Sequence, residues 1–204
     1  MTSRPSPPSI LFSASETVHQ PGDFITGDAK FYSYLEGRVA AAATATTGNP
    51  LEIRSRQLVK NTYDMERLFH DACPVGRVSR KTARFACSSL EDCLVYASKQ
   101  YSAPFYVYEV EMPDAVAAPM ALAGHARKII EQDLQRAEAM AAEYWEPKHT
   151  WHYWEYLGGG MTVLKDGLRF IPPVALDQEA VTRKKLYDED AANAASVDWL
   201  AGSL

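Results

Sequence analysis

The sequence lacks the features that mark membrane, secreted and duplex-binding proteins. No stretch approaches the ~20 uninterrupted apolar residues of a membrane-spanning helix, and the amino-terminal MTSRPSPPS has no apolar core of a cleaved secretion signal. The formal charge is −5 and no long basic run occurs, whereas a duplex-binding surface needs clustered positive charge. We therefore expect a cytoplasmic protein without membrane or duplex nucleic acid as a partner. Secretion by a machine that reads no cleaved signal stays open.

Cysteine is also scarce. The three cysteines, Cys73, Cys87 and Cys93, are odd in number and lack the spacing of metal ligands. They are typical of reduced, mostly buried thiols in a cytosolic protein. His149 and His152 have a spacing that would suit a metal on a helix, but no third ligand is evident and a proline precedes them closely. We expect no metal site.

Length and composition predict one globular domain. The chain has 204 residues, of which 47% are hydrophobic and 23% charged, close to the average for a folded domain. Residues 1–8 are rich in proline and serine and should form a flexible tail. Residues 9–175 should form the domain, and the alanine-rich, acidic residues 176–204 should add a helical extension.

Alternating apolar and polar residues predict the strands. Between the first two predicted strands, the turn-rich residues 19–31 are expected to form a loop. Asp166-Gly167 suits a tight turn and predicts a hairpin between the last two strands. The predicted strands are Ser9–Ser15, Ala83–Cys87, Phe105–Met112, Met161–Lys165 and Leu168–Ile171.

Apolar residues at three- and four-residue intervals predict the helices. One of them begins at Ser88 and Ser89, which carry a capping pattern with Glu91 and Asp92. The other predicted helices are Tyr34–Thr47, Arg54–Ala72, His125–Trp145 and one in the last thirty residues. Because these helices separate the strands unequally, the order predicts a mixed α+β fold with mixed or antiparallel sheets, not a doubly wound one.

The richest stretch for chemistry runs from His149 to Leu164. Trp151, Tyr153 and Trp154 crowd around a single carboxylate, Glu155, ahead of three glycines. A carboxylate among rings loses hydration, which raises its pKa and strengthens its interaction with a developing positive charge. Glu155 is therefore the first catalytic candidate. The alternative is that the rings are ordinary core and that Glu155 faces water beside them.

Other segments could meet Glu155 in one cleft. Ser88 and Ser89 stand at a helix start, which receives an anion or a ribose hydroxyl well, but they also suit a simple cap. Arg80 could pair with a phosphate or could be a solvated surface arginine. Tyr96 and either Tyr106 or Tyr108 could stack on a planar ligand or pack in the core.

Several short motifs together resemble those of NAD-dependent ADP-ribosyltransferases. They are a first strand ILFSAS, a Pro-Gly-Asp turn, FACSS leading into LEDCLVYA, a strand FYVYEVEM, and a late WEYL ahead of the last strands. The likeness extends from Ile10 to Ile171 and is greatest to the small bacterial branch that includes the rifampin-modifying transferases. It implies an ADP-ribosyltransferase-like fold and NAD as substrate. It further implies transfer of ADP-ribose to an unidentified acceptor, a protein or a small molecule, as in a bacterial toxin or effector.

The resemblance also assigns roles to particular residues. The first-strand position that contacts the nicotinamide ribose or amide falls at Ser13, the second-strand position at Ser88 and Ser89, and the late glutamate at Glu155. The nicotinamide would stack on a ring, and the pyrophosphate would be bound by an arginine. The ring candidates are Tyr96, Tyr108 and Trp154, and the arginine is Arg80.

Ser13 departs from the family pattern, in which this position is usually Arg or His. One explanation is that Arg54, Arg56 or Arg80 supplies the missing contact from elsewhere. The other is that the chain has kept the fold without NAD chemistry and recognises a nucleotide or a protein partner.

Overall fold

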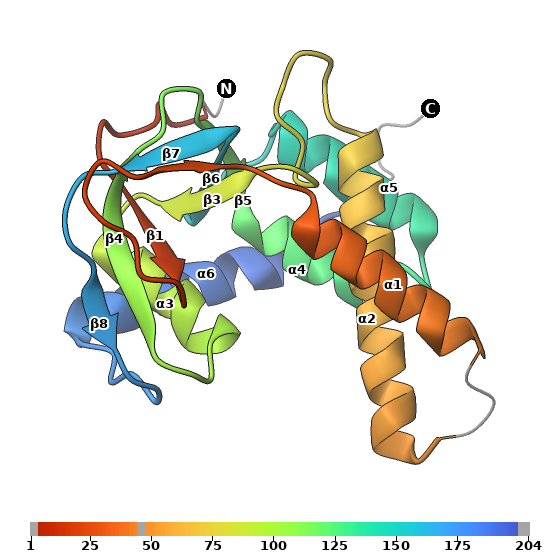
Figure 1. The fold of residues 1–204 in the computed structure, drawn as a ribbon. Coiled ribbons are helices and arrows are strands. Elements are labelled where there is room, and N and C mark those ends of the chain that lie inside the picture. The colour runs from red at the N-terminus through yellow and green to blue at the C-terminus, as the bar shows by residue number, and fades with distance from the viewer. Residues whose placement is uncertain (1–3, 45–47, 200–204) are drawn as a thin grey trace.

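The protein has a mixed α+β fold built on one antiparallel sheet, as predicted from the order of elements. The computed structural model describes residues 4–44 and 48–199 (Figure 1). Its eight strands follow the order β2-β7-β4-β1-β3-β6-β5, and β8 pairs with β4 beside β7. The strands are β1 (Leu11–Ser15), β2 (Phe24–Thr26), β3 (Arg84–Cys87), β4 (Phe105–Glu111), β5 (Val116–Pro119), β6 (Trp154–Gly158), β7 (Gly160–Val163) and β8 (Leu168–Phe170).

The described part of the chain contains six helices. Within those residues, no helix combines the length and apolar character needed to cross a membrane. The helices are α1 (Lys30–Thr44), α2 (Pro50–Asp71), α3 (Leu90–Gln100), α4 (Met120–Ile129), α5 (Leu134–Trp145) and α6 (Gln178–Ser196).

The two faces of the sheet bury different sets of side chains. One face carries Cys87, Val107 and Leu157, which pack against helices α2 to α5. The opposite face carries Tyr108 and Tyr156 in a separate cluster with residues of β7. Because successive side chains of a strand point to opposite faces, this division decides which candidate residues can meet.

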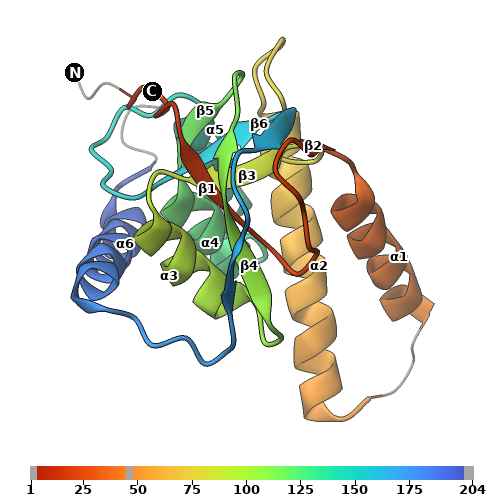
Figure 2. The same cartoon turned by 60° about the vertical axis from the view of Figure 1, so that its left-hand side comes forward.

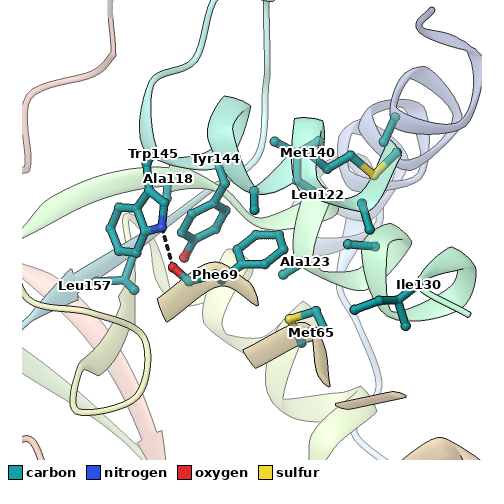
Figure 3. Packing of buried hydrophobic residues seen from close by; sticks show 14 of the residues in the cluster. Met65, Phe69, Ala118, Leu122, Ala123, Ile130, Met140, Tyr144, Trp145 and Leu157 are labelled. Carbon is teal, nitrogen blue, oxygen red and sulfur yellow. Dashed lines mark hydrogen bonds between the residues drawn. The ribbon is translucent and has the colours of Figure 1, made fainter. Parts of the chain in front are cut away.

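The largest hydrophobic cluster lies between α2, α4 and α5. Figure 3 shows Tyr144 and Trp145 of α5 packed near Phe69 of α2, and the Trp145 indole N–H donates to the Phe69 carbonyl at 2.7 Å. Phe69 and Tyr144 rings meet edge to face at 4.9 Å. Both rings are fully buried, so this contact fixes the end of α2 against α5.

Helices α1 and α2 form an arm that extends beyond the rest of the molecule (Figures 1 and 2). Tyr32 of α1 packs on Tyr63 of α2 with ring centroids 5.1 Å apart. The first half of α2 leaves Leu51 and Leu58 exposed, whereas its second half buries Met65 and Phe69. The apolar stripe of α2 therefore continues past the body that covers it.

Three local expectations are wrong. The predicted helix His125–Trp145 is two helices, because the chain turns after Ile130 and Asp133 caps α5 by accepting from the Arg136 amide at 3.0 Å. The predicted hairpin is absent: β7 and β8 each pair with β4 and not with each other. The expected loop 19–31 contains β2, which completes an edge of the sheet against β7.

The carboxyl-terminal helix is tightly attached to the body. Helix α6 lies against α3 and α4 (Figure 1) and buries Ala180, Asp190 and Ala194. At the other end of the chain, Arg4 donates to the Trp145 carbonyl. Residues 1–3 of the predicted tail and residues 200–204 of the predicted extension lie outside the described residues.

Candidate functional site

Glu155 lies in the interior, on the face of the sheet that the helices cover. Strand β6 stands between β3 and β5, and Glu155 is paired with Cys87 on one side and Ala118 on the other. Cys87 is in turn paired with Phe12 of β1. Glu155 is only 6% exposed, so the expectation of a solvent-facing carboxylate does not apply.

Arg80 is the main partner of Glu155. It lies in the segment between α2 and β3, and its Nη1 donates to Glu155 Oε1 at 2.5 Å and to the Tyr144 hydroxyl at 2.6 Å. Its Nε and Nη2 donate to the two carboxylate oxygens of Glu66 at 3.0 and 3.1 Å. Tyr144 itself donates to Glu155 Oε1 at 2.8 Å. Glu66, Arg80, Tyr144 and Glu155 therefore form one buried network, which we call the Arg80 network.

Rings enclose the guanidinium of this network. Its central carbon lies 4.8 Å from the Phe85 ring centroid and 5.2 Å from that of Tyr144. Aromatic faces favour a cation that has left water, and Arg80 side-chain exposure is only 9%. The alternative that Arg80 is a solvated surface residue is thus wrong.

Charge and burial act in opposite directions at Glu155. Burial raises the pKa of Glu155, while Arg80 and the Tyr144 hydroxyl oppose that rise. The pKa of Tyr144 is also raised, chiefly by burial, so Tyr144 stays a neutral donor. When Glu155 is ionised, its charge and that of Glu66 exceed the single positive charge of Arg80, and in a site of low dielectric this favours a ligand that carries positive charge.

The recorded hydrogen bonds hold Glu155 by one of its two oxygens. Within residues 4–44 and 48–199, every hydrogen bond to this carboxylate falls on Oε1. The side chain keeps 8% of its surface exposed. The network therefore orients the carboxylate through one oxygen, and little of the Glu155 side chain is exposed.

The rings before Glu155 are core residues held by other buried carboxylates. Glu143 accepts from the amides of Lys148 and His149 at 2.9 and 2.8 Å and from the Trp151 indole at 3.0 Å. Asp190 of α6 accepts from two further amides of the same segment, those of His152 at 2.8 Å and of Tyr153 at 2.7 Å. The alternative that Trp151 and Tyr153 are ordinary core residues is therefore correct.

The two serines at the start of α3 act in the cap. Ser89 is the N-cap and accepts from the Asp92 amide at 3.1 Å, and Ser88 donates to the Asp92 carboxylate at 2.8 Å. Asp92 also accepts two bonds from Arg183 of α6, at 2.6 and 2.7 Å. Both hydroxyls therefore have internal partners close to Cys87 and Glu155.

Ser13 is not brought to Glu155. It is paired with Tyr108 across β1 and β4, on the opposite face of the sheet, and its hydroxyl donates to the Phe85 carbonyl at 2.9 Å. Of the three arginines considered as a substitute for the family's first-strand contact, only Arg80 reaches the site. Arg54 and Arg56 lie in the first half of α2, in the arm.

The candidate stacking rings also lie on both sides of the sheet, so that only some of them are near Glu155. Tyr96 of α3 lies near the site: burial and the charges of Tyr101 and Glu155 raise its pKa. Tyr108 is on the other face, and its hydroxyl donates to the Thr17 carbonyl at 3.1 Å. Trp154 precedes Glu155, is half-buried, and donates to the Trp151 carbonyl at 3.2 Å.

Glu66 and Tyr144 are the residues of the site that the sequence did not reveal. Tyr144 fell on the apolar face of a predicted helix and so looked like core, and Glu66 had no motif. A weak signal for Glu66 was its place between Met65 and Phe69, where the helix should be buried. Their contact with Arg80 depends on how α2 and α5 pack, which helical spacing does not determine.

No metal site accompanies this network. Among the described residues, no group of three or more His, Cys, Asp or Glu side chains is placed to bind a metal ion. Comparison with known proteins adds no family: no family model matches this chain, and no curated protein matches it.

Proposed function

We propose that this chain uses NAD as a substrate and transfers its ADP-ribose to an acceptor, with Glu155 as the catalytic carboxylate. The observation that carries the proposal is the environment of Glu155, which is buried among helices and held by Arg80 and Tyr144 through Oε1. The adjacency of strands β1, β3 and β6 supports it, because these strands carry the three motifs that resemble ADP-ribosyltransferases. On this proposal the fold is ADP-ribosyltransferase-like.

The charge of the site suits this reaction. When the bond between ribose and nicotinamide breaks, nicotinamide leaves with the bonding electrons and a positive oxocarbenium ion develops at the ribose. A fixed carboxylate stabilises that cation more than the ground state. The acceptor then bonds to the same ribose carbon and loses a proton. Arg80 serves as a positioning residue and not as a ligand of the pyrophosphate, because both edges of its guanidinium are engaged by protein groups.

A second function is favoured by the internal partners of Ser88, Ser89 and Ser13. Each of these hydroxyls bonds within the protein, which suits a domain of the same fold that binds a nucleotide or a protein without turnover. The two functions differ in whether NAD is consumed. Fold likeness by itself does not decide between them.

The test is to incubate the purified protein with labelled NAD and a cell lysate. Released nicotinamide with a labelled product supports transfer, nicotinamide alone indicates a glycohydrolase, and NAD binding without turnover supports the second function. Glu155→Gln should lower turnover by about 10²–10³-fold, the scale of losing one preorganised electrostatic group. The fold should persist, because Arg80 keeps its two bonds to Glu66. Turnover equal to wild type would remove Glu155 from the mechanism.

A further inference from the structure

We propose that Glu66 and Tyr144 are positioning residues that set the ionisation of Glu155 in opposite directions, with Arg80 as the group that connects them. The inference deepens the proposed function and rests on it for its kinetic consequence only. Neither residue belongs to the sequence motifs that identified Glu155 as the catalytic candidate. Both act on Glu155 from helices outside the sheet.

Glu66 competes with Glu155 for one positive charge. The Glu66 carboxylate binds Arg80 in the two-bond geometry, at 3.0 and 3.1 Å, and its side chain is only 10% exposed. Glu155 receives a single bond from the same guanidinium. Because Glu66 is also a negative charge nearby, it disfavours the ionised form of Glu155 both directly and by holding Arg80.

Tyr144 acts in the other sense. Its hydroxyl donates to the same oxygen of Glu155 that Arg80 reaches, at 2.8 Å, and this bond favours the ionised carboxylate. Tyr144 is fully buried and packs on Phe69, so it has little freedom to leave this position. The ionised form of Glu155 is thus favoured by Tyr144 and Arg80 and disfavoured by burial and by Glu66.

Other ionisable groups face Glu155 and must stay constant in the test. They are Cys87 on β3, Tyr96 on α3 and Tyr187 on α6, each of which the Glu155 charge influences. None of them has a hydrogen bond to Glu155 in the described part of the chain. Substitutions at Glu66 and Tyr144 leave all three in place.

The experiment is a pH titration of the Glu155 carboxyl carbon by NMR in the full-length protein, with its signal assigned by its loss in Glu155→Gln. Glu66→Gln keeps the shape and removes the competing charge, so the midpoint should fall by roughly one pH unit. Tyr144→Phe removes one donor, so the midpoint should rise. Glu138→Gln, an exposed position on α5, should leave it unchanged. A purely structural role would not move the midpoint in two opposite directions.

Equal midpoints in wild type and both variants, or shifts of both in one direction, would overturn the inference. If Glu66→Gln does not fold, Tyr144→Phe decides alone, because its midpoint must rise. The acid limb of the pH profile of kcat/KM for NAD should follow the same two shifts. If the midpoints shift as expected but neither wild type nor any variant consumes NAD, the proposed function is wrong and the inference stands. If NAD is consumed but the midpoints do not shift, the inference is wrong and the proposed function stands.

Discussion

Individual buried carboxylates hold the parts of this protein together. Glu143, Glu155 and Asp190 are nearly or fully buried and each accepts several hydrogen bonds from the segment 148–153 or from Arg80 and Tyr144. Asp92 does the same between α3 and α6. A buried carboxylate is tolerated only when donors surround it, so each of these residues depends on its partners.

The pair between Asp92 and Arg183 gives a residue-scale prediction. Arg183→Met should lower the free energy of unfolding by roughly 3 kcal/mol, because fully buried Asp92 would lose its positively charged partner and two hydrogen bonds. Chemical denaturation at neutral pH measures this loss. Lys184→Met is the control: its pair with Asp188 is exposed, and its loss should cost within about 0.5 kcal/mol. Similar costs in the two variants would contradict the prediction.

At the scale of elements, substitutions at the start of α3 distinguish a capping role of Ser89 from a ligand-binding role. Ser89→Ala should cost about 1 kcal/mol of stability, because the Asp92 amide loses its acceptor. Ser89→Asn should restore most of that stability, since asparagine caps as well as serine. Thermal denaturation of the two variants gives the comparison. Loss of NAD binding in Ser89→Asn at unchanged stability would instead show that the hydroxyl itself contacts the ligand.

Helix α2 should also respond unevenly along its length. Phe69→Ala should cost about 3–5 kcal/mol, because the ring is fully buried against Tyr144. Leu58→Ala, at a position that is 54% exposed, should change stability by less than about 0.5 kcal/mol. Denaturant titration of both variants measures the contrast. A large cost at Leu58 would mean that the arm is covered in solution.

At the scale of the whole molecule, buried tyrosines predict a loss of stability in alkali. Burial raises the pKa of Tyr101 from its usual value of about 10 to about 12, and the pKa values of Tyr108 and Tyr153 are also raised. Between pH 10 and 12 the unfolded chain releases the Tyr101 proton and the folded chain keeps it. The folded state therefore binds more protons, and stability falls as pH rises, by about 1.4 kcal/mol per pH unit for each such tyrosine.

Denaturation at several alkaline pH values, with tyrosinate absorbance as a second readout, tests this expectation. Tyr101→Phe should lose about 1 kcal/mol at neutral pH, because the hydroxyl donates to the Ala14 carbonyl at 3.1 Å. In the range from pH 10 to 12, however, its stability should fall less steeply than that of wild type. An identical slope in both proteins would show that Tyr101 titrates normally.

Local sequence patterns determined much of the secondary structure. The serines and acidic residues at 88–92 predicted the start of α3, and alternation predicted β1, β3 and β4, because capping and side-chain periodicity act over a few residues. The mixed α+β class followed from their order. The sequence also identified Glu155 and Arg80 as residues of interest, from composition around the first and from a resemblance for both.

Only the tertiary structure decided what those residues contact. The predicted hairpin was wrong because β7 and β8 pair with different parts of β4, β7 at residues 110–111 and β8 at residues 105–107. Ser13 lies on the face of the sheet opposite to Glu155 because strand register fixes the face of each residue. That register is set by long-range pairing between strands. Glu66 and Tyr144 lie beside Glu155 because α2 and α5 pack together. Such packing depends on side chains far apart in the chain, such as Trp145 and Phe69 at a separation of 76 residues, which no local pattern connects.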